Sequence, residues 1–184
     1  FYESEYFLGY KDGKLAGRVA AIINHKANER WNCKSVRFGW IDFIDDREVS
    51  KALLQAVEDY GKSKGMDNVV GPLGFTDMDP EGMLTWGFDQ LGTMPTIYNY
   101  SYYPEHIEAL DGYEVDNKYV EYKLIVPDTV PEKYAKIAAM IEKRYNLHVR
   151  KLTKKDVFQG GYGQKSFELI NATYKDLYGY SELS

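Results

Sequence analysis

The residues best suited to do chemistry are one carboxylate, Asp42, and a cluster of tyrosines far from it in the sequence. Asp42 lies inside an apolar run, where a carboxylate needs a hydrogen-bonding partner or an altered pKa. It could accept a proton from an amine, or it could face solvent, because alternation places Ile41 and Phe43 on the opposite side. The tyrosines could donate a proton, form a hydrophobic wall for an acyl chain, or pack as ordinary aromatic residues. The catalytic candidates are therefore Asp42, Tyr98, Tyr102 and Tyr103.

A strand followed by a helix must position Asp42. Residues 36–44 are rich in β-branched and aromatic residues, which is typical of a buried strand. Asp45 and Glu48 have the spacing of a capping box, and Gly65 can adopt the left-handed conformation that ends a helix. Between them, apolar residues recur with the helical period at Val49, Ala52, Leu53, Ala56, Val57 and Tyr60.

A second strand is predicted over residues 68–73, directly after the helix. Two strands joined by one crossover helix should be parallel neighbours, which makes this stretch a βαβ unit. Ligands of open α/β sheets bind beyond the carboxyl ends of such strands. A small-molecule site is therefore expected near residues 42–47 and 74–79.

The rest of the chain predicts a mostly antiparallel sheet around this unit. Before it come strands at 5–10 and 15–23, joined by an Asp12-Gly13 hairpin turn, and a polar loop at 24–35. After it come a long connection at 74–99 with a short helix at 83–86, a helix at 104–110 and a strand at 119–126. The predicted fold class is α+β, with a mixed sheet.

A proline-flanked segment at 127–131 predicts a linker between residues 1–126 and residues 132–184. The second part should contain a helix at 132–145, a strand at 147–152, a glycine-rich turn at 160–163 and a last helix striped by Phe167, Ile170, Tyr174, Leu177 and Tyr178. We interpret it as the truncated start of a second module. Its apolar helix face needs a partner, either the first module or a second copy of the chain.

Composition narrows the class of protein. The chain has 184 residues, 44% of them hydrophobic, which excludes global disorder. A single cysteine, Cys33, fits a reducing compartment, and no apolar run is long enough to span a membrane, so a cytoplasmic location is expected. The net charge of −5 disfavours nucleic acid as a partner. Residues 130–155 nevertheless carry eight Lys and Arg against two Glu, a net +6 that forms either a solvated face or a peripheral contact with an anionic membrane.

Other polar groups are expected to have structural roles. Asp77, Asp79 and Glu81 alternate like calcium ligands but lack the pattern of a calcium loop, so no metal is predicted. His106 is expected at the surface and His25 in a loop, and the glycine-rich turn lacks the lysine and spacing of a phosphate loop.

The order of elements resembles the GNAT fold of acyl-CoA-dependent N-acyltransferases. The resemblance is carried by "EYFLGYKDGKLAGRVAAIINHKANE", "VRFGWIDFIDDREVSKALLQAVEDYGKSKGM", "GPLGFTDMDPEGM", "TIYNYSYYPEHIEALDGYE" and "YGYSELS". These strings look like a bacterial family of tandem GNAT-like proteins grouped with the bacterial ceramide synthase-like acyltransferases. The resemblance implies acetyl-CoA or a longer acyl-CoA as co-substrate and a small-molecule or lipid amine as acceptor. It also implies that "HVRKLTKKD" begins a second GNAT-like module.

The chain departs from that family where CoA should bind. GNAT modules hold the CoA pyrophosphate on a glycine-containing loop before a helix, whereas this chain has Asp45-Asp46-Arg47-Glu48 there. Three carboxylates at the positive end of a helix would repel a pyrophosphate. A tyrosine that often serves as general acid is also replaced, by Glu108. The remaining candidates for cofactor contact are Arg47, Gly74 and Phe75.

The predicted function is therefore the N-terminal portion of an N-acyltransferase, with this module degenerate for CoA binding. The alternative is a non-catalytic GNAT-like module that binds a lipid or amine or supports a catalytic half. A third hypothesis, an aminoacyl transferase acting with tRNA, is disfavoured by the negative charge.

Overall fold

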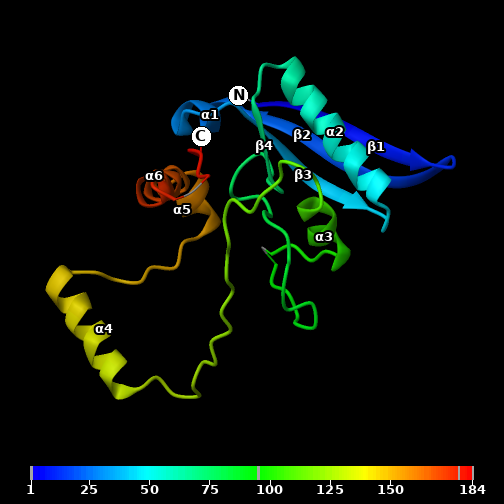
Figure 1. Cartoon of the computed structure of the whole chain (residues 1–184). Coiled ribbons are helices and arrows are strands. Elements are labelled where there is room, and N and C mark those ends of the chain that lie inside the picture. Colours follow the sequence, from blue (N-terminus) through cyan, green and yellow to red (C-terminus); the bar gives the residue numbers. More distant parts are fainter. Residues whose placement is uncertain (1, 95, 178, 184) are drawn as a thin grey trace. The chain divides into compact units, whose positions relative to one another are not determined.

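The computed structural model describes residues 2–94, 96–177 and 179–183, which form two compact units (Figure 1). The first unit comprises the chain up to Asn117 and the segment from Asn171 onward, and the second comprises Lys118–Ile170. The first unit contains the sheet and every candidate site residue. The linker predicted at 127–131 and the second GNAT-like module remain predictions.

A four-stranded mixed sheet in the order β1-β2-β3-β4 is the framework of the first unit. β1 (Tyr2–Lys11) pairs with β2 (Lys14–Asn24), and β2 pairs with β3 (Ser35–Phe43), both antiparallel. β4 (Asn68–Val70) runs parallel to β3, with α2 (Arg47–Ser63) as the crossover between them. The predicted α+β class, with a mostly antiparallel sheet and one parallel βαβ unit, is confirmed.

The hairpin turn falls where it was predicted. Asp12 and Gly13 have φ angles of 51° and 75°, the pair of positive values that a tight hairpin turn requires. β4 is shorter than predicted and ends at Val70, since Pro72 has no N–H to extend the ladder.

α2 lies along one face of the sheet (Figure 1) and buries Val49, Ser50, Leu53, Leu54, Val57 and Gly61. Ala52, predicted on this face, is exposed. The N-cap is Asp46 rather than Asp45: its carboxylate accepts from the N–H groups of Glu48 and Val49, because Asp46 directly precedes the first helical residue. Gly65 has a φ of 76°, as predicted for the residue that ends the helix.

Two short helices of the first unit differ from prediction. The expected polar loop at 24–35 contains α1 (His25–Trp31), capped by the side chain of Asn24. Ala27 is its one fully buried residue, so the sequence carries no helical apolar period. The helix predicted at 104–110 is α3 (Tyr102–Glu108), and residues 83–86 are not helical.

The second unit contains α4 (Glu132–Tyr145), as predicted, and α5 (Lys154–Phe158), which was missed although Thr153 and Asp156 form a capping box at its start. α6 (Tyr162–Tyr174) begins in this unit and includes Gly163, which was predicted in a turn. The strands predicted at 119–126 and 147–152 are absent from the described residues, because neither segment pairs with one of the four described strands. Leu177 lies beyond α6, and Tyr178 is outside the described residues. No described helix combines the length and apolar character needed to cross a bilayer.

Candidate functional site at the carboxyl end of β3

A β-bulge shapes the end of β3. The register between β2 and β3 shifts between Arg18 and Ala20, and Trp40 on β3 has a φ of 45°. Bulges re-aim the side chains that follow them and are common beside functional sites. Beyond this one, Phe43 is buried and Asp42 is exposed, as the alternation predicted.

Two tyrosines of α3 bind the end of β3. The hydroxyl of Tyr103 donates to the carboxylate of Asp42 and accepts the backbone N–H of Phe43 at 3.1 Å. The hydroxyl of Tyr102 donates to the backbone carbonyl of Phe43 at 2.7 Å. The ring of Tyr103 also stacks on that of Phe43, with 4.1 Å between the ring centroids. Three of the four predicted catalytic residues therefore lie together.

Burial and the bond to Asp42 raise the pKa of Tyr103 above its ordinary value. Desolvation is the larger cause, because Tyr103 is only 4% exposed. The hydroxyl therefore stays protonated and serves as a fixed donor to Asp42. Desolvation also raises the pKa of Tyr102.

Tyr98, the fourth predicted catalytic residue, does not join this cluster. Its hydroxyl donates to the carbonyl of Phe88 at 2.8 Å, and its ring meets that of Phe88 edge-on. Tyr100 is the tyrosine that extends the cluster, since it stacks on Tyr102 with ring centroids 5.4 Å apart. The spacing of the tyrosines in the sequence did not show that Tyr98 lies outside the cluster and that Tyr100 belongs to it.

His106 was expected at the surface, and this expectation is wrong: the residue is 4% exposed. One ring nitrogen, Nδ1, lies 3.0 Å from Ser50 Oγ, and the other, Nε2, lies 3.0 Å from Asp45 Oδ1. The four-residue spacing from Tyr102, which places both rings on one face of a helix, was the signal that could have revealed this position.

The N-terminus of α2, where a CoA pyrophosphate was considered, is already occupied by the protein's own charges. Asp46 Oδ1 accepts from Glu48 N at 2.9 Å and from Val49 N at 3.4 Å. Lys11 of β1 binds the carboxylates of both Asp46 and Glu48. The bond from Lys11, followed by the backbone N–H groups, lowers the pKa of Asp46. Arg47 is exposed beside this cluster.

Gly74 and Phe75, the other cofactor candidates, turn their backbone carbonyls toward the protein. Arg37, which is buried, donates to Gly74 O at 3.2 Å and to Phe75 O at 3.3 Å, and Asn24 Nδ2 donates to Phe75 O at 2.9 Å. Burial lowers the pKa of Arg37. The ring of Phe75 contacts those of Tyr2 and Trp40. These contacts hold the 74–75 segment against the sheet, and a role in cofactor binding remains a prediction.

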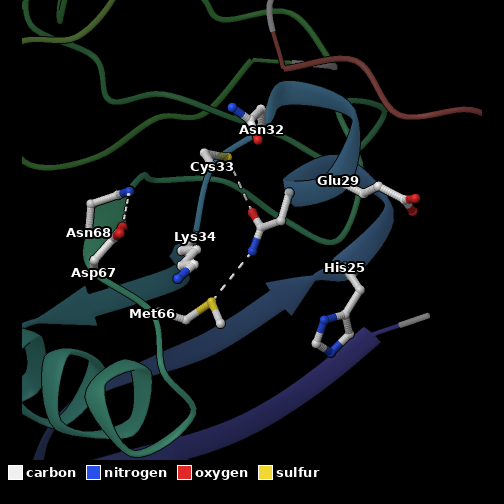
Figure 2. Close-up of a pocket in the computed structure, with 9 residues that line it drawn as sticks. His25, Glu29, Asn32, Cys33, Lys34, Met66, Asp67 and Asn68 are labelled. Carbon is white, nitrogen blue, oxygen red and sulfur yellow. Dashed lines mark hydrogen bonds between the residues drawn. The ribbon is translucent and has the colours of Figure 1, made fainter.

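A surface hollow of about 570 Å³ lies at the other end of β3, beside the start of that strand (Figure 2). Figure 2 shows Cys33 and Met66 among its lining residues, together with His25, Glu29, Asn32, Lys34, Asp67 and Asn68. The side chain of Asn28 accepts from the Cys33 thiol and donates to the sulfur of Met66. None of the predicted site residues lines this hollow. Among the described residues, no three His, Cys, Asp or Glu side chains come together as a metal site.

Comparisons with known proteins give two partial matches. The chain is 36% identical over 103 residues to the protein YghO of Escherichia coli strain K12, which covers 56% of this chain and 26% of that protein. It is 32% identical over 88 residues to a bacterial ceramide synthase of Caulobacter vibrioides, which covers 47% of this chain and 23% of that protein. No family model and no solved structure gives a significant match. The matched part is about a quarter of the length of each relative, and the similarity indicates a distant relationship.

Proposed function

We propose that this chain is a GNAT-like module of a longer N-acyltransferase that moves an acyl group from acyl-CoA to an amine. The partial similarity to a ceramide synthase supports this reaction class, since a ceramide is an amino alcohol acylated on its nitrogen. The α+β fold and its parallel βαβ unit agree with the GNAT resemblance.

The module would contribute the acceptor side of the reaction. Asp42 is an exposed carboxylate at the end of β3, and Tyr103 donates to one of its oxygens. A carboxylate fixed in this way can bind an ammonium group and take one proton from it, which leaves the neutral amine that attacks a thioester. The exposed Tyr100 and its stacked neighbour Tyr102 would present aromatic surface to the rest of the acceptor.

This module would not hold the CoA pyrophosphate in the usual GNAT way. The observation that carries this part of the proposal is the carboxylate of Asp46 on the first free N–H groups of α2, with Lys11 already bound to it. A pyrophosphate at this helix end would have to displace that carboxylate and approach Glu48.

Calorimetric titration of acetyl-CoA and palmitoyl-CoA into this chain tests the CoA part of the proposal. We expect no micromolar binding. Asp46→Asn should bind CoA more tightly than the natural chain because it removes a negative charge from the helix end. Asp59→Asn, near the other end of α2, is the matched control and should leave CoA binding unchanged. Micromolar binding by the natural chain would show that the module is a CoA site after all.

An activity assay distinguishes this proposal from the alternative. In the alternative, the module is non-catalytic and binds an amine or lipid or supports a catalytic half. The product of the whole gene is incubated with acyl-CoA donors and amine acceptors, and release of free CoA is followed. Asp42→Asn should reduce release by about 10²-fold or more if Asp42 is the base. Unchanged release in this variant supports the non-catalytic alternative, and no release with any donor contradicts the acyltransferase itself.

A further inference from the structure

α3 depends on tertiary contacts for its position. It has only seven residues, and its N-cap, Ser101, makes no hydrogen bond through its side chain. A helix this short does not persist in water without tertiary contacts. Its two buried residues are Tyr103, which binds Asp42, and His106. The position of the tyrosines therefore depends on their own contacts with β3 and on those of His106.

The ring of His106 connects three parts of the first unit. Its Nδ1 lies 3.0 Å from Ser50 Oγ on α2, and its Nε2 lies 3.0 Å from Asp45 Oδ1 in the turn after β3. Its ring also packs against those of Phe43 and Tyr102, each with 5.4 Å between ring centroids. One side chain thus ties α3 to the strand end, to the turn and to the helix that follows.

Hydrogen-bond chemistry fixes the direction of one of these contacts. A carboxylate only accepts, so Nε2 must carry a proton and donate to Asp45. The Ser50 hydroxyl has one proton, and both Nδ1 at 3.0 Å and the backbone carbonyl of Arg47 at 3.2 Å lie within reach of it. The geometry therefore places a proton on Nε2, whichever of the two contacts the Ser50 hydroxyl donates to.

The three residues have the composition of a hydrolytic triad, but Ser50 cannot act as a nucleophile here. It is 1% exposed, and it faces the core side of α2 within the helix. Its hydroxyl also lies 3.2 Å from the backbone carbonyl of Arg47. Of these three residues only Asp45 is exposed, with 70% of its side chain accessible. It lies on the far side of His106 from the Ser50 hydroxyl.

We propose that His106 is the positioning residue of the site: it donates from Nε2 to Asp45, forms a hydrogen bond with Ser50 through Nδ1, and so keeps α3 docked with Tyr103 on Asp42. It does not touch the reacting groups itself. The proposal rests on the proposed function and deepens it, because it names what orients Asp42, the carboxylate that would bind the amine. This positioning role requires only contacts within the first unit. A negative result in the CoA and activity assays would therefore not contradict it.

Nitrogen NMR of the His106 ring tests whether Nε2 carries a proton in the natural chain, and amide hydrogen exchange tests the docking of α3. The amide of Phe43 donates to the hydroxyl of Tyr103, so its exchange rate reports whether α3 is docked. The amide of Ile22, in a fully buried part of β2, reports global opening.

We expect a proton on Nε2. We also expect His106→Leu to speed Phe43 exchange at least tenfold more than Ile22 exchange. His106→Asn, which keeps a polar group near the Nδ1 position, should restore part of the protection. Ser50→Ala should also speed Phe43 exchange more than Ile22 exchange, and this variant carries less risk to folding. His25→Gln, which changes a half-exposed histidine paired with Glu3, is the matched control and should leave Phe43 unaffected.

Three results would overturn the proposal. The first is a His106 ring that carries no proton on Nε2. The second is unchanged Phe43 exchange in His106→Leu and Ser50→Ala. The third is an increase that Ile22 follows in parallel, which would mean that His106 stabilises the whole unit rather than the position of α3.

Discussion

Replacing Tyr103 by Phe isolates the contribution of one hydroxyl to the candidate site. The ring can keep its stacking on Phe43, while two hydrogen bonds disappear. The bond to Asp42 contributes little to this loss, because Asp42 is exposed and water can replace the phenol. The backbone N–H of Phe43 loses its acceptor in a buried position, which costs about 1–3 kcal/mol.

The free energy of unfolding from urea titration measures this cost. At this chain length about 1 kcal/mol corresponds to a fall of roughly 2–4 °C in Tm. Tyr98→Phe is the matched control: it removes a hydroxyl from a residue that is 62% exposed, and it should change stability by less than about 0.5 kcal/mol.

Alkaline pH gives the same variant a second, independent test. Burial raises the pKa of Tyr103 above its ordinary value of 10.0, so the unfolded chain loses this proton at a lower pH than the folded chain does. The stabilisation by Tyr103 is therefore complete below pH 10 and decreases as pH rises above it. The stability difference between the natural chain and Tyr103→Phe should shrink above pH 10. A cost equal to that of Tyr98→Phe, or a difference that does not change with pH, would refute the role assigned to this hydroxyl.

Two further predictions concern the packing of α2 and the basic segment. Gly17→Ala should cost about 1–3 kcal/mol, because the new methyl group would lie 2.7 Å from Leu53 Cδ1 and 2.8 Å from the carbonyl of Asp42. Gly9→Ala, on the paired strand, meets Leu53 only at 3.4 Å and should cost less; equal unfolding free energies would contradict this packing. We also expect residues 130–155 to bind vesicles containing phosphatidylserine, with about 1 kcal/mol per lysine near the surface. Sedimentation should show this binding weakened by Lys133→Gln with Lys143→Gln and by high salt, and equal binding to neutral vesicles would contradict it.

The sequence predicted the framework of the first unit because its signals are local. The Asp12-Gly13 turn, the apolar run at 36–44 and the helical period after Arg47 each specify one element without help from distant residues. The α+β class follows from their order. α1 escaped prediction because a short polar helix with one fully buried residue carries no periodic signal. The strands expected at 119–126 and 147–152 require a pairing partner, and no local pattern supplies one.

The candidate site was predicted in part. Asp42 and the tyrosine cluster were identified from residue type, but their meeting depends on α3 packing beside the end of β3. Tyr98 was predicted as a catalytic candidate and the nearly adjacent Tyr100 was not, yet only Tyr100 stacks on the cluster. His106 was predicted at the surface from its residue type alone, although its four-residue spacing from Tyr102 places both rings on one face of the helix.

The sequence by itself therefore determined the strands of the sheet, α2 and the carboxylates at the start of α2, since these depend on neighbouring residues and their periodicity. Tertiary structure alone decided which side chains meet: Tyr103 with Asp42, Lys11 with Asp46, and His106 with both Ser50 and Asp45. The physical reason is that each of these contacts joins residues from different elements, and the distance between two elements is set by how the whole core packs.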